Sequence, residues 1–163
     1  MTSTTVPTIL LISILILLLI AFIVSILQLS QIRSKTGFST STNLQTAYDY
    51  SIGVLILNLF SLIFIIVVAI DYARKKITRS NLFTGLIIFT AATLFVGIIL
   101  CGIAAQKSSN SAAIGNLILM IVIFILTIAL IFYSRRIPKY IAPELKDLCN
   151  VNIEKEVEKE KIH

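Results

Sequence analysis

Four long apolar stretches, none of which contains a charged residue, constrain the fold of this chain more than any other feature. They occupy residues 9–29, 51–70, 82–105 and 112–133. A helix needs ~20 residues to cross about 30 Å of hydrocarbon, and in lipid it satisfies its own backbone polar groups. Barrel strands would be shorter and would alternate in polarity. The sequence therefore predicts an all-α membrane protein with four transmembrane helices.

Composition supports this class. Of the 163 residues 57% are hydrophobic and 13% are charged, and the mean hydropathy is +0.98. Soluble domains are nearer ~45–50% apolar and about 25% charged. These values exclude a disordered chain, a disulfide-framed miniprotein and a typical water-soluble enzyme.

Short links between the stretches predict the architecture. Residues 71–81 and 106–111 are too few to let successive helices pack other than antiparallel. We expect one domain, residues 1–136, built as an up-down four-helix transmembrane bundle. Residues 137–163 follow as a short cytoplasmic juxtamembrane segment and charged tail. The first stretch is too long for a signal peptide and lacks leading Lys or Arg, so it is predicted to be retained.

The first connection, residues 30–50, is the longest, and the order Thr42-Asn43-Leu44-Gln45 near its end fits a capping box. The second helix is therefore expected to begin near Asn43, well before the apolar stretch itself.

Basic residues predict the orientation. Near the ends of the stretches, four Lys and Arg lie in the link 71–81 and four in residues 134–146, against three on the opposite side, which places both termini in the cytoplasm. The membrane-surface basic residues singled out are Arg74, Lys75, Lys76, Arg79, Arg135 and Arg136. Besides setting orientation, they are candidates for anionic lipid headgroups. Since basic residues flank apolar stretches throughout, no nucleic acid partner is expected.

All five tyrosines fall at predicted membrane interfaces, where an amphipathic ring is most stable. We expect interfacial anchors at Tyr48, Tyr50, Tyr72, Tyr133 and Tyr140.

Small residues recur at every fourth position of the third stretch, which lets a neighbouring helix approach closely. This candidate helix-packing or oligomer interface comprises Thr93, Gly97, Cys101 and Ala105, with a shorter pair, Ala21 and Ser25, in the first stretch. Packing within the bundle and homo-oligomerisation both explain it.

Two amides, Asn58 and Asn116, lie inside stretches. An amide in hydrocarbon needs a partner, so each is predicted to make an interhelical hydrogen bond. A contact with a substrate or ion is the alternative.

No catalytic or metal site is visible. The one histidine is His163, and Cys101 and Cys149 have no metal-ligand spacing. No Asp, Glu, Lys, Arg or His lies within a stretch, where pumps and coupled transporters place such groups. No cofactor is expected. A palmitoylated Cys149 is an alternative to a free thiol.

The leading functional hypothesis is a non-enzymatic structural or scaffold protein of the membrane. It would recruit a protein partner, or further copies of itself, through its outer loop and cytoplasmic tail. One alternative is an oligomeric channel or small-solute transporter. The other, by analogy with small multi-span proteins of A/T-rich large DNA viruses, is a virion inner-membrane component that links membrane to capsid.

Overall fold

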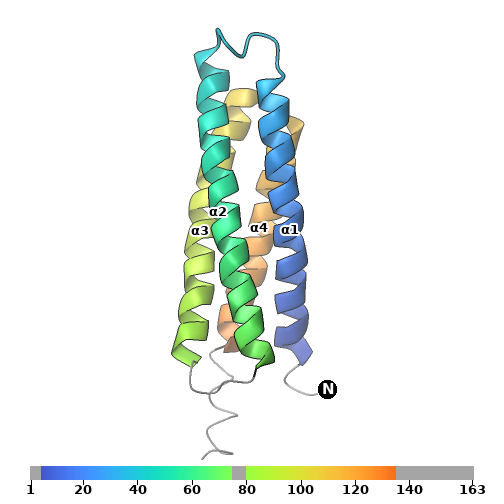
Figure 1. The fold of residues 1–163 in the computed structure, drawn as a ribbon, viewed down its shortest axis with the longest axis vertical. Helices are drawn as coiled ribbons and strands as arrows, with labels where there is room; N and C mark the ends of the chain where they lie inside the picture. Colours follow the sequence, from blue (N-terminus) through green and yellow to red (C-terminus); the bar gives the residue numbers. More distant parts are fainter. Residues whose placement is uncertain (1–4, 75–79, 135–163) are drawn as a thin grey trace, which may run out of the picture.

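Four long helices follow one another along the chain in a computed structural model that describes residues 5–74 and 80–134 (Figure 1). They are α1 (Thr5–Arg33), α2 (Thr42–Ala73), α3 (Ser80–Ser108) and α4 (Ser111–Ser134). Each is long and apolar enough to cross a membrane. Over the described residues, the prediction of an all-helical protein with four helices able to cross a membrane is confirmed.

The helices extend beyond the apolar stretches that predicted them. α2 contains 32 residues and α4 contains 24. At 1.5 Å per residue these helices are roughly 48 Å and 36 Å long, against about 30 Å of hydrocarbon. The ends of the bundle, α2 above all, therefore reach headgroup depth and beyond.

The start of α2 differs from the predicted capping box by one residue. Ser41, not Thr42, is the N-cap, and its hydroxyl accepts a hydrogen bond from the Leu44 backbone N–H at 3.4 Å. The Gln45 side chain reaches back past the cap to the carbonyls of Phe38 and Ser39. Gly37, at φ +84°, supplies the left-handed turn that this connection requires.

Each helix packs against two neighbours, so the four form a closed ring in the order α1, α2, α3, α4. Figure 1 shows successive helices running in alternate directions, with the α1–α2 and α3–α4 connections at one end. Hydrogen bonds agree: Thr8 near the start of α1 bonds Tyr72 near the end of α2, and Gln28 near the end of α1 bonds Ser51.

Buried residues recur at alternating steps of three and four along every helix. In α1 they are Leu11, Ile14, Leu18, Ala21, Ser25, Gln28 and Ile32, and in α2 the same spacing runs from Ala47 to Val68. This 3.5-residue repeat is the packing of left-handed helical bundles. The opposite faces expose Ile, Leu, Val and Phe, as a surface in contact with lipid should.

Candidate functional site

A cluster of polar side chains lies in the core of the bundle, and we call it the polar layer. It comprises Ser25 and Gln28 of α1, Ser51 and Asn58 of α2, and Asn116 of α4. Every member is at most 1% exposed. All five occupy positions of the 3.5-residue repeat, so the helical geometry that buries the apolar core also brings these groups together.

Helix α1 is the centre of this layer. The Ser25 hydroxyl accepts from Asn58 Nδ2 at 2.8 Å and from Asn116 Nδ2 at 3.0 Å, and donates to the Ala21 carbonyl of its own helix. Gln28 Oε1 also accepts from Asn116 Nδ2, at 3.0 Å, while Gln28 Nε2 donates to the Ser51 hydroxyl at 2.8 Å. Three helices are thus joined through two side chains of α1.

Two acceptors of the layer have no partner. Asn58 Oδ1 and Asn116 Oδ1 are both buried, and neither forms a hydrogen bond within the described residues. Most buried polar atoms are paired, because an unpaired one carries its desolvation penalty uncompensated. The layer therefore has spare acceptor capacity for a small neutral donor or a cation.

The small residues of α3 face other helices of the same chain. Cys101, fully buried, lies with Sγ 3.4 Å from the Ala113 carbonyl of α4. A Cβ added to Gly97 would collide with Met120 Cε, so the Met120 side chain of α4 packs directly against this glycine. Thr93 shares a 2.7 Å hydrogen bond with Ser61 of α2. Ala105 is 9% exposed, and Ala21 is fully buried beside Ser25.

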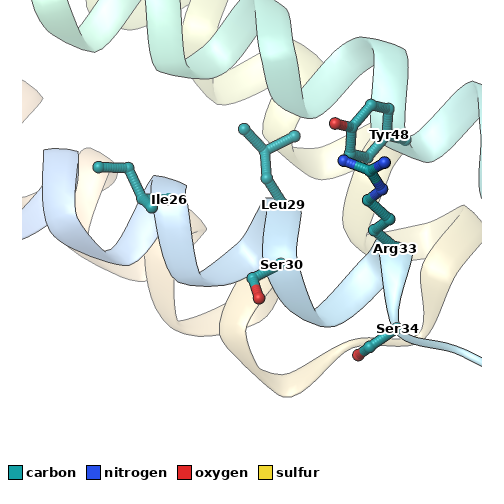
Figure 2. Close-up of a pocket in the computed structure, with 6 residues that line it drawn as sticks. All are labelled: Ile26, Leu29, Ser30, Arg33, Ser34 and Tyr48. Atoms are coloured by element: carbon teal, nitrogen blue, oxygen red, sulfur yellow. The ribbon is translucent and has the colours of Figure 1, made fainter.

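A groove opens on the surface between the end of α1 and the start of α2 (Figure 2). Its volume is about 470 Å³. The side chains that line it are Ile26, Leu29, Ser30, Arg33, Ser34 and Tyr48. One part of this groove is therefore apolar, and the other carries hydroxyls and a guanidinium.

The remaining predicted residues lie at the helix ends or outside the described chain. Tyr48 and Tyr50 occupy the first turns of α2, Tyr72 its last turn, and Tyr133 the end of α4. Arg74 caps the C-terminus of α2. Outside the described residues lie Lys75, Lys76, Arg79, Arg135, Arg136, Tyr140 and Cys149.

The sequence did not predict that Gln28 and Ser51 belong to the polar layer, or that Arg33 lines a groove. Gln28 and Ser51 are at the ends of apolar stretches, where a polar residue is ordinarily interpreted as the boundary of the stretch and not as part of a buried cluster. Their spacing was the available signal, because Ser25 and Gln28 are three residues apart and Ser51 and Asn58 are seven apart, the intervals of a helix repeat.

Over residues 5–74 and 80–134, no three His, Cys, Asp or Glu side chains come close enough to hold a metal ion. Comparison with protein-family models, with curated proteins and with solved structures gave no match.

Proposed function

We propose that this protein is a non-enzymatic membrane scaffold, in which a self-contained four-helix bundle anchors exposed segments that bind a partner. The supporting observation is the way the interior is filled. Large side chains such as Leu18, Ile65 and Met120 are fully buried along the bundle, and the polar layer bonds mainly to itself. Such a core holds the helices together and leaves the connections and tail for recognition.

In this proposal the helices cross the bilayer alternately, with both termini and the tail in the cytoplasm. The excess of Lys and Arg beside the link 71–81 and the tail supports this orientation. An N-glycosylation acceptor engineered into residues 36–40 should be modified in microsomes, whereas the same acceptor after residue 150 should not. Modification of the tail acceptor alone would show that the orientation is the opposite of the proposed one.

Recruitment is tested by crosslinking in the native membrane and purification. A specific protein should copurify with the full chain, and deletion of residues 144–163 should release a cytosolic one. The matched control deletes residues 2–4, on the same proposed side, and should keep it. Recovery of the protein only as an isolated monomer, with or without residues 144–163, would contradict the proposal.

A channel or small-solute transporter is the second candidate, because one observation favours it. The unpaired oxygens of Asn58 and Asn116 lie in a neutral polar layer that three helices share. If this layer conducts, Asn58→Leu should reduce solute flux into liposomes. If liposomes with the wild-type protein show the same flux as empty liposomes, or as liposomes with the Asn58→Leu variant, conduction through the polar layer would be excluded.

A further inference from the structure

We propose that the α1–α2 groove binds one glycerophospholipid, whose phosphate pairs with the Arg33 guanidinium and whose acyl chain lies along Ile26 and Leu29. The groove is lined by these three residues together with Ser30, Ser34 and Tyr48 (Figure 2). Nothing in the scaffold proposal requires this site, so the two can fail independently.

Depth in the membrane matches a phospholipid. Leu29 ends the first apolar stretch, and Arg33 follows four residues later in the same helix. At 1.5 Å per residue the guanidinium is attached about 6 Å beyond the end of the apolar stretch. This is the depth at which lipid phosphates lie and at which a Tyr such as Tyr48 is most stable.

The side chains of the groove change from apolar to charged along the same direction, from the membrane centre toward the surface. Ile26 is 48% exposed and lies two turns nearer the membrane centre than Arg33. Leu29 and Arg33 both extend toward α2, and Tyr48 projects from α2 into the same space (Figure 2). Ile26 and Leu29 lie nearer the membrane centre, and the planar guanidinium of Arg33, with five N–H donors, lies nearer the surface. This is the order of acyl chain and phosphate in a phospholipid.

Charge at this end of the bundle favours an anion. The ends of α1 and α3 and the start of α2, with their connections, carry Arg33, Lys35 and Lys107 against one acid, Asp49. Lys35 Nζ donates a hydrogen bond to the Ser108 carbonyl at the end of α3. Arg33 is exposed and faces the groove, so it is the cation positioned to pair with a phosphate there.

The apolar lining identifies the source of the phosphate. A free phosphate ion would gain nothing from Ile26 and Leu29, whereas a lipid buries its chain against them. A volume of about 470 Å³ is in the range of ligand pockets, ~300–1,000 Å³. The groove is therefore large enough for a glycerophosphate group, with the acyl chains continuing over the exposed faces of the helices.

The test is native mass spectrometry of the purified protein titrated with phosphatidylglycerol. Wild type should bind one lipid, and Arg33→Gln should weaken that binding by about tenfold, because a charge-assisted hydrogen bond to phosphate is lost. Lys107→Gln is the matched control. It removes one exposed positive charge at the same end of the bundle and should leave the affinity unchanged.

Equal weakening by Arg33→Gln and Lys107→Gln would reduce the effect to general charge and overturn the proposal. Displacement of the lipid by inorganic phosphate at equal concentration would overturn it too, since the apolar lining would then be irrelevant. Both substituted side chains are exposed, and unchanged helical circular dichroism would establish that both variants fold.

Discussion

Ser25→Ala should loosen the bundle more than any other removal of a single hydroxyl. Ser25 Oγ is the shared acceptor for Asn58 Nδ2 of α2 and Asn116 Nδ2 of α4. Without it, the hydrogen bond that Asn58 makes to α1 is gone. Asn116 keeps its bond to Gln28 Oε1, so the damage falls mainly on the α1–α2 side of the layer.

The magnitude follows from the number of bonds. Interhelical hydrogen bonds in membranes are worth on average ~0.6 kcal/mol each, so loss of two removes about 1.2 kcal/mol. A buried donor left unpaired adds to this, by ~1–3 kcal/mol in water-soluble proteins and less where the unfolded state also finds partners. We expect a loss of about 2 kcal/mol in the free energy of unfolding.

Cys101 provides the assay. Its thiol is fully buried in the core, so alkylation by N-ethylmaleimide requires the bundle to open. In a Cys149→Ser background, which leaves Cys101 as the only thiol, Ser25→Ala should accelerate alkylation by roughly 30-fold, the factor for about 2 kcal/mol. Ser30→Ala, an exposed hydroxyl on the same helix, is the control and should leave the rate nearly unchanged.

A double-mutant cycle separates the hydrogen bond from other effects of the substitution. In an Asn58→Ala background one of the two donors to Ser25 is already absent, so Ser25→Ala should cost about 0.6–1.7 kcal/mol less than in wild type. Equal alkylation rates for Ser25→Ala and Ser30→Ala, or a coupling energy of zero, would refute the assignment of Ser25 as the shared acceptor.

The same alkylation assay tests two further contacts. Gly97→Leu should destabilise the bundle by about 1–3 kcal/mol, because its side chain would have to displace the Met120 side chain that packs against Gly97. Gly102→Leu, at a glycine with open space around it, should be tolerated, and equal effects of the two substitutions would contradict this packing. Asn110→Ala should cost ~0.5–2 kcal/mol, because the Asn110 side chain accepts from the Ala112 backbone N–H at 3.2 Å at the start of α4. Ser111→Ala, exposed beside it, should not change the rate, and parity between these two variants would show that the cap contributes nothing.

The existence of four helices was predictable because length and apolarity alone determine whether a segment can cross lipid. Their ends were predictable only in part. The capping-box pattern placed the start of α2 near Asn43, one residue from the observed Thr42, whereas residues 30–33 are polar enough to be taken for a connection and yet continue α1. Once apolar turns have nucleated a helix, each further residue adds a backbone hydrogen bond, and the Ser41 cap completes the start of α2.

The inward faces of the helices were harder to predict, and the reason is physical. In a soluble bundle water selects the polar face, but here the outer face contacts lipid, which is as apolar as the core. Hydrophobic residues therefore occur all round each helix, and only the few polar and small residues carry information on direction. Asn58 and Asn116 could be placed inward because an amide is too costly to leave in lipid.

The polar and small residues of α3 carry the same information on direction. The four-residue stripe from Thr93 through Gly97 and Cys101 to Ala105 departs from the 3.5-residue repeat, so its middle members lie on the repeat and its outer members beside it. Steps of three, four and seven between polar and small residues instead select Thr90, Gly97, Cys101, Ala104 and Ser108 on α3, all of them buried. On α1 and α2, the same repeat connects Ser25 with Gln28, three residues apart, and Ser51 with Asn58, seven residues apart, and these are four of the five residues of the polar layer.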